Sequence, residues 1–159
     1  MSDTVLKSVK PEKCPMLKEE KESKRQLASK LKGVQLFSGL DDKNLERIAE
    51  SGRQVFFEAG TKIVQQGELG LAFLLILDGG VEVIRDGKRL ASLGRGQFFG
   101  EMTAVDDQPR SADVIATGPT TCFGLPAWSF DAMLAGNPSV AKQMIRELVR
   151  RLRQVENST

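Results

Sequence analysis

The chain has 159 residues, of which 40% are hydrophobic and 28% are charged, so it is long enough to form one domain with a core. Lysine and arginine number 23 against 21 aspartate and glutamate residues, a net charge of +2 that is too even to indicate nucleic-acid binding. The sequence contains no histidine, which excludes histidine-ligated metal sites and serine–histidine catalytic triads.

The cysteines and the hydropathy pattern indicate where the protein works. Cys14 and Cys122 lie far apart and match neither a metal-binding spacing nor a disulfide framework. Residues 1–30 lack the apolar run of a signal peptide, and no stretch approaches the ~18–20 apolar residues that span a bilayer. We therefore expect a soluble protein in the reducing cytoplasm.

The first third of the chain is predicted to be helical. Residues 1–33 hold nine basic and five acidic side chains, and we expect residues 1–31 to be a solvated, lysine-rich tail or helix outside a domain at 32–159. The composition of residues 19–32 favours a helix that Gly33 ends. After a short apolar turn, Asp41 or Asp42 is expected to cap a second helix, whose apolar positions are Leu45, Ile48 and Ala49.

The middle of the chain is predicted to be all β. Short apolar runs alternate there with glycine-bearing turns every 6–12 residues, a pattern typical of an antiparallel roll or barrel. Asp86-Gly87 is a strong hairpin signal between two of the runs. The predicted strands cover residues 55–57, 61–64, 73–77, 81–84, 89–93, 113–116 and 121–125.

Helical periodicity returns near the C-terminus. Residues 129–134 predict a short helix that ends at Gly136-Asn137-Pro138, and a last helix is predicted to begin at Ser139. Its apolar residues are expected on one side. Four of them have the 3, 4, 3 spacing of a coiled-coil seam, namely Ile145, Leu148, Leu152 and Val155. Two heptads leave two alternatives open, packing against its own roll and a homodimer. The apolar residues are Val140, Ala141, Met144, Ile145, Leu148, Leu152 and Val155.

The segment between Gly96 and Ala112 carries the chemistry. Gly100 permits close backbone approach to a ligand, and Glu101 offers a carboxylate that can accept a hydroxyl proton. Arg110 offers a planar donor fork that matches two phosphate oxygens, and Ser111-Ala112 leaves backbone N–H groups accessible. These residues suit a ligand with one phosphate and one sugar hydroxyl. By themselves, Glu101 and Arg110 are more typical of an ordinary surface ion pair than of a ligand site.

The surrounding motifs supply a family resemblance. Phe99-Gly100-Glu101-Met102, followed by Pro109-Arg110-Ser111-Ala112, resembles the phosphate-binding cassette of the cyclic nucleotide-binding domain family. That family includes the catabolite activator protein and the regulatory subunits of cAMP-dependent protein kinase. Further similar motifs are Leu36-Phe37-Ser38-Gly39-Leu40, Ala59-Gly60-Thr61-Lys62-Ile63, Gln66-Gly67-Glu68-Leu69-Gly70 and Ile76-Leu77-Asp78-Gly79. The resemblance covers about residues 32–155. It implies a mainly β fold, an antiparallel β-roll (double-stranded β-helix, or jelly roll) with N-terminal helices and a C-terminal lid helix.

The resemblance also implies roles for individual residues. Glu101 would accept the ribose 2′-hydroxyl, and Arg110 would pair with the exocyclic phosphate oxygens. Gly100, Met102, Ser111 and Ala112 would donate hydrogen bonds to the phosphate and sugar. The predicted walls of the nucleotide pocket are Val83, Leu90, Ala91 and Phe99, and the lid residues near the purine are Arg151, Leu152 and Val155. Ser111 follows the arginine where cGMP-binding domains often carry threonine, which favours cAMP over cGMP.

The functional prediction is a receptor without catalytic activity that signals through its terminal helix to an unidentified protein effector. No direct binding to membrane or nucleic acid is expected. A DNA-binding regulator would carry a helix-turn-helix domain after the long helix, and the sequence ends at Thr159, so the alternatives are a fragment of such a regulator and a stand-alone receptor. A non-binding interaction module on the same fold and a metal-dependent enzyme of the cupin type are the remaining alternatives.

Overall fold

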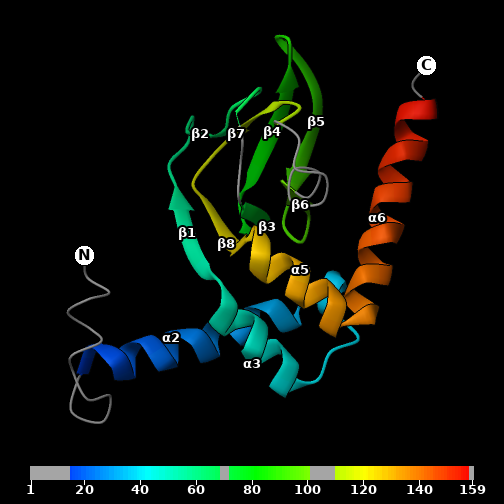
Figure 1. The fold of residues 1–159 in the computed structure, drawn as a ribbon. Helices are drawn as coiled ribbons and strands as arrows, with labels where there is room; N and C mark the ends of the chain where they lie inside the picture. Colours follow the sequence, from blue (N-terminus) through cyan, green and yellow to red (C-terminus); the bar gives the residue numbers. More distant parts are fainter. Residues whose placement is uncertain (1–14, 69–71, 101–109, 158–159) are drawn as a thin grey trace.

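The computed structural model describes residues 15–68, 72–100 and 110–157, with side chains described from residue 23 onward (Figure 1). Helices lie at both ends of the described chain, and two antiparallel sheets lie between them. The helices are α2 (Pro15–Lys32), the 3₁₀ helix η2 (Gln35–Phe37), α3 (Asp42–Ser51), α5 (Ala127–Gly136) and α6 (Pro138–Asn157). The mainly β fold with flanking helices is therefore as predicted.

Eight strands in the described part of the chain form the sheets, and all their pairings are antiparallel. One sheet has the strand order β1-β8-β3-β6 and the other has the order β2-β7-β4-β5. The strands are β1 (Arg53–Phe57), β2 (Lys62–Val64), β3 (Ala72–Asp78), β4 (Gly80–Arg85), β5 (Lys88–Gly94), β6 (Phe98–Phe99), β7 (Asp113–Ala116) and β8 (Thr120–Pro126). Seven of them match the predicted runs. The sequence does not predict the two-residue strand β6, because its apolar pair is too short to show a period.

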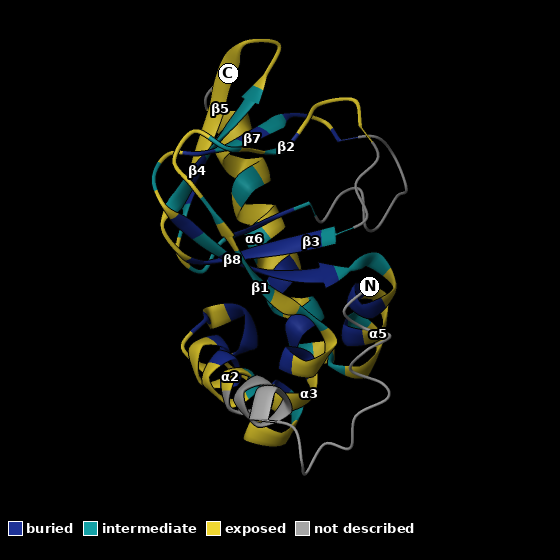
Figure 2. Cartoon of the chain, turned by 90° about the vertical axis from the view of Figure 1, so that its left-hand side faces the viewer, coloured by how far each residue is buried: buried dark blue, intermediate teal, exposed yellow. Residues whose placement is uncertain are grey.

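Strand β3 is buried on both faces and separates two hydrophobic cores. Phe73, Leu75 and Leu77 contact the core beneath the helices, whereas Leu74 and Ile76 contact the core inside the roll. Side chains alternate between the faces of a strand, so a continuous apolar run is what a strand covered on both sides requires. The sheet that contains β3 is therefore shared by the roll and the helical layer (Figure 2).

The helical layer is built around the N-terminal helices. Asp41 caps α3, because its side chain accepts a hydrogen bond from the backbone N–H of Asn44 at 2.9 Å. Leu45, Ile48 and Ala49 are buried as expected. Helix α2 ends at Lys32 as predicted and contributes Leu27, Ala28 and Leu31 to the core. The domain boundary at residues 31 and 32 stays a prediction.

The Asp86-Gly87 turn joins β4 to β5. Asp86 has φ of 52° and Gly87 has φ of 79°, which fits a two-residue turn of the type that matches the twist of a hairpin. Farther along, the register shifts by one residue, because Val83 pairs with Ala91 while Ile84 pairs with Arg89. Leu90 is the extra residue of this bulge.

The apolar residues of helix α6, which are expected on one side of it, divide between buried and exposed positions. Val140 and Met144 are buried against the other helices, but Ile145, Leu152 and Val155 are 61%, 59% and 61% exposed. At 3.6 residues per turn, adjacent Met144 and Ile145 point in different directions, and the helix continues past the helical layer (Figure 1). Neither α6 nor any other helix of the described residues is long and apolar enough to cross a bilayer.

Candidate ligand-binding site

Arg110 is fixed by backbone hydrogen bonds to the turn that precedes β3. Its N–H donates to the Glu68 carbonyl and its own carbonyl accepts from the Gly67 N–H, both at 2.8 Å. The Arg110 side chain is only 8% exposed, and its Nη2 donates to the Ala72 carbonyl at 2.8 Å. Because the Arg110 guanidinium is buried, it is not part of an exposed surface ion pair, the alternative that the sequence alone allowed.

Gly100 lies directly against the Arg110 side chain. Its φ is 86°, in the left-handed region that favours glycine. A Cβ at this position would lie 2.5 Å from Arg110 Nη1 and 2.6 Å from the Ala72 carbonyl oxygen. The chain therefore has no room for a side chain here. This close approach brings together two residues that are ten positions apart in the predicted cassette.

Ser111 and Ala112 lead from Arg110 into β7. The Ser111 carbonyl accepts a hydrogen bond from Arg85 Nε at 3.0 Å, and Ser111 itself is exposed. Ala112 is buried. The next residue, Asp113, accepts the Gln66 N–H at 2.7 Å through its carboxylate, which ties the Gln66-Gly67-Glu68 turn to the start of β7. The residues around Arg110 are thus anchored on both sides.

The four residues of the predicted pocket wall differ in exposure. Phe99 is 3% exposed in the core of the roll, and Val83 packs against the same core. Ala91 is the direct partner of Val83 across the hairpin, but it is exposed. Leu90 is 55% exposed because it occupies the bulge. The roles of Leu90 and Ala91 in a ligand-binding wall stay predictions.

The C-terminal helix reaches the roll through Arg151. Its Nη2 donates to the Phe98 carbonyl at 2.6 Å, and its guanidinium carbon lies 4.5 Å from the centre of the Phe98 ring. Phe98 begins the strand that leads to Gly100, so Arg151 connects α6 to the predicted cassette. Leu152 and Val155, the other lid residues, are exposed.

Two predicted ligand contacts, Glu101 and Met102, lie outside the described residues. The described part still permits a test of whether a cyclic phosphate suits this place. A guanidinium provides paired N–H donors for phosphate oxygens, and it is more effective where water is scarce. Gly100 leaves the backbone approachable beside it. The residues present therefore fit a phosphate group at Arg110.

Two features of the site gave no clear signal in the sequence. The Ala72 carbonyl orients Arg110, but a backbone acceptor is invisible in a sequence. The Gln66-Gly67-Glu68 turn is part of the family resemblance, but its hydrogen bonds to Arg110 depend on the fold. Hydrogen bonds between segments about 40 residues apart are decided by tertiary structure.

Comparison with known proteins agrees with this geometry. Residues 54–137, more than half of the chain, match the model of the family described as "Cyclic nucleotide-binding domain". The chain belongs to this family. The resemblance to protein kinase regulatory subunits is confirmed by a relative of that name from Yarrowia lipolytica, and the resemblance to the catabolite activator protein by the solved structure of that protein from Thermus thermophilus.

Individual relatives show how far the similarity extends. The cyclic AMP receptor protein of Thermus thermophilus is 32% identical over 131 residues, which is 79% of this chain and 61% of that protein. A cGMP-dependent protein kinase of Plasmodium berghei is 38% identical over 87 residues, 55% of this chain and 10% of the kinase. The chain thus spans less than two thirds of the length of these relatives.

A solved structure supports the β-roll fold. The regulatory domain of Toxoplasma gondii PKA, crystallised with cAMP, superposes with a TM-score of 0.71 at 27% identity. The match covers 81% of this chain and 51% of the other. The β-roll with flanking helices is therefore the shared architecture, and the predicted fold is confirmed.

Proposed function

We propose that this domain is a non-catalytic cAMP receptor that works in the cytoplasm. The observation that carries the proposal is the buried Arg110 side chain, which is held by the Ala72 carbonyl against a glycine with no space for a Cβ. Arg110 would bind the exocyclic phosphate oxygens, and Glu101 would bind the ribose 2′-hydroxyl. Cyclic AMP is preferred over cGMP because serine, rather than threonine, follows Arg110.

Binding would be converted into a signal by α6. A ligand shifts a conformational equilibrium only by binding one state more tightly than the other. The Arg151–Phe98 contact joins α6 to the strand that precedes Gly100. Movement of the cassette would therefore be transmitted to α6. We propose that cAMP changes the position of α6 and thereby the surface offered to a protein effector.

The proposal is tested by calorimetric titration of the purified protein with cAMP and with cGMP. Arg110→Ala is expected to weaken cAMP binding by about 2–5 kcal/mol, the usual cost of removing one partner of a buried charged pair. Glu101→Gln is expected to cost less, because an amide oxygen still accepts one hydrogen bond.

The matched control is Arg53→Ala, which removes an exposed arginine from β1 and should leave the affinity unchanged. Unchanged affinity in Arg110→Ala would refute the role assigned to Arg110. Tighter binding of cGMP than of cAMP would refute the ligand preference.

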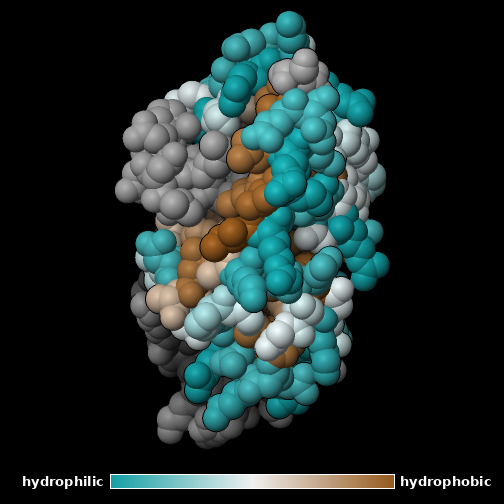
Figure 3. All heavy atoms as spheres, turned by 90° about the vertical axis from the view of Figure 1, so that its right-hand side faces the viewer, coloured by the Kyte–Doolittle hydropathy of each residue, from teal (hydrophilic) through white to brown (hydrophobic). Residues whose placement is uncertain are grey.

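A second proposal concerns the exposed apolar side of α6. Ile145, Leu148, Leu152 and Val155, the four residues with coiled-coil spacing, remain exposed in the chain. Figure 3 shows an apolar band on the face of the molecule that carries α6. Of the two alternatives from the sequence, this exposure favours a homodimer, because self-packing would have buried these residues.

A further inference from the structure

The tip of the β4–β5 hairpin, residues 85–88, lies at the end of the roll opposite α2 and α3 (Figure 1). The pairing of β4 with β7 ends at Ile84 and Asp113, so the sheet does not hold the tip to the segment that precedes β7. The side chains of the tip are exposed. Because exposed turns with few buried contacts open at a low free energy, any further restraint on the tip comes from hydrogen bonds beyond the sheet.

The Gln66 side chain supplies two of these hydrogen bonds. Its Nε2 donates to Asp86 Oδ1 at 3.0 Å, and its Oε1 accepts the Asp86 N–H at 3.2 Å. A carboxamide carries a donor and an acceptor at one end, so a single side chain can bind a carboxylate and a backbone N–H together. The Gln66 backbone is itself anchored, because its N–H donates to Asp113 Oδ1 at 2.7 Å.

The remaining hydrogen bonds connect this turn and the hairpin tip to Arg110 and Ser111. The Arg110 N–H donates to the Glu68 carbonyl, and the Arg110 carbonyl accepts from the Gly67 N–H, both at 2.8 Å. On the other side, Arg85 Nε donates to the Ser111 carbonyl at 3.0 Å. The turn that precedes β3, the hairpin tip and the Arg110 segment are thus each bonded to the other two, which closes a ring of hydrogen bonds.

We propose that Gln66 is a positioning residue for the cyclic nucleotide, because it holds the β4–β5 hairpin in a fixed place relative to Arg110. The predicted wall residues Val83 and Ala91 pair with each other on this hairpin. A ligand that contacts Arg110 at one end and the hairpin at the other binds more tightly when both are already in place, since ordering them during binding costs free energy. This role rests on the proposed function, a nucleotide bound at Arg110.

The test exchanges the donor and the acceptor in calorimetric titrations of the full chain with cAMP. Gln66→Glu removes the amide donor and sets a second carboxylate beside Asp86, so it should weaken cAMP binding by about tenfold. Asp86→Asn keeps an oxygen acceptor, and asparagine tolerates the φ of 52°, so this variant should bind nearly as the wild type does. The double variant Gln66→Glu/Asp86→Asn again faces an amide with a carboxylate and should recover most of the lost affinity.

The control for the added charge is Gln65→Glu, which changes the adjacent exposed glutamine and should leave cAMP affinity unchanged. All variants are titrated at a temperature at which thermal unfolding shows them to be folded, so a loss of stability does not count as a loss of affinity. The positioning role alone is overturned if Gln66→Glu binds as the wild type does, if the double variant binds no better than Gln66→Glu, or if Gln65→Glu loses as much. A wild-type protein that does not bind cAMP overturns the proposed function, and this role with it.

Discussion

At the scale of single residues, Arg110 illustrates how burial increases the energetic effect of a charged side chain on binding. An exposed arginine contributes little through ion pairs, about 0–1 kcal/mol, because water screens it. At 8% exposure the guanidinium has lost most of its water, and the Ala72 carbonyl replaces part of that hydration. A phosphate bound here would interact with a charge that water screens poorly. Removal of the Arg110 side chain is therefore expected to weaken cAMP binding strongly.

Gly100 allows a prediction that separates backbone strain from crowding. Gly100→Ala should both destabilise the fold and weaken cAMP binding by about tenfold or more, because the new methyl group would displace the Arg110 guanidinium. Gly60→Ala is the matched control, since Gly60 has a similar φ of 83° but nothing within 4 Å of a Cβ. Thermal unfolding and calorimetry measure the two effects, and equal cAMP affinity in both variants would contradict the assigned contact.

At the scale of elements, the two halves of α6 make different contacts with the rest of the domain. Its first half packs Val140 and Met144 into the helical layer, which fixes the helix to the domain. Its second half keeps an apolar side exposed and contacts the roll through Arg151. A helix held at one end is well suited to move at the other end when a ligand changes its contacts.

The exposed side of α6 leads to a prediction about assembly. Leu152→Asp should convert a dimer into a monomer, because a carboxylate in an apolar seam would lose its hydration without gaining a partner. Light scattering coupled to size-exclusion chromatography measures the mass. Gln154→Asp adds the same charge to another side of the helix and should preserve the dimer. A wild-type protein that is monomeric at all concentrations would refute the dimer proposal.

At the scale of the whole molecule, the two cores make the shared sheet central to stability. The sheet with β3 and β8 separates the roll core from the helical core, and both strands contribute residues to each. Cys122 on β8 is fully buried in the roll core, and burial raises the pKa of its thiol to about 12. The thiol can react only when the roll opens, so it reports on that opening.

Thiol labelling is therefore expected to be slow in the native state. In a Cys14→Ser background, Cys122 should resist an aromatic disulfide reagent at pH 8, since only about 10⁻⁴ of the thiol is ionised there. Guanidinium chloride should restore rapid and complete labelling, with the labelled fraction following the unfolding transition. Fast labelling without denaturant would show that the roll opens independently of global unfolding.

The sequence by itself determined which segments of the chain form most of the helices, strands and turns. Hydrophobic period, caps and turn residues are local signals, so α3 with its Asp41 cap, the Asp86-Gly87 hairpin and the apolar run of β3 could all be predicted. The cassette motif likewise located Arg110 and Gly100, because specific residue types were required at fixed spacing.

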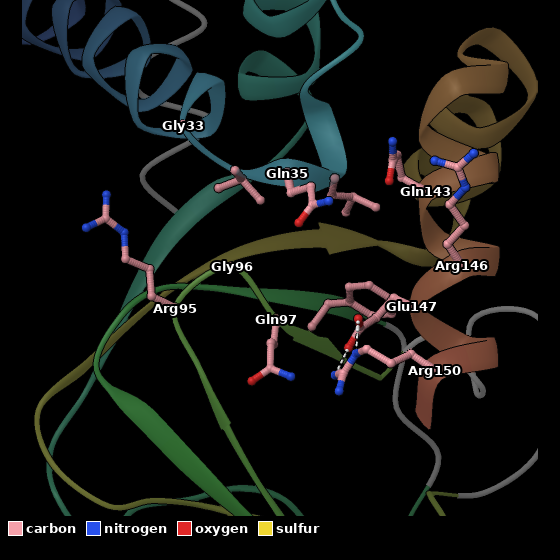
Figure 4. Close-up of a pocket in the computed structure, with 12 residues that line it drawn as sticks. Gly33, Gln35, Arg95, Gly96, Gln97, Gln143, Arg146, Glu147 and Arg150 are labelled. Atoms are coloured by element: carbon pink, nitrogen blue, oxygen red, sulfur yellow. Dashed lines mark hydrogen bonds and ion pairs between the residues drawn. The ribbon is translucent and has the colours of Figure 1, made fainter. Parts of the chain in front are cut away.

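Tertiary structure decided which of these residues meet. The bulge that exposes Leu90, the Ala72 carbonyl at Arg110 and the division of α6 at Met144 all depend on contacts between distant segments. The cleft between η2, the β5–β6 turn and α6 (Figure 4) is likewise lined by segments that lie more than 40 residues apart along the chain. A local pattern carries no information about such neighbours, because packing and backbone hydrogen bonds between remote segments are set only when the sheets and helices come together.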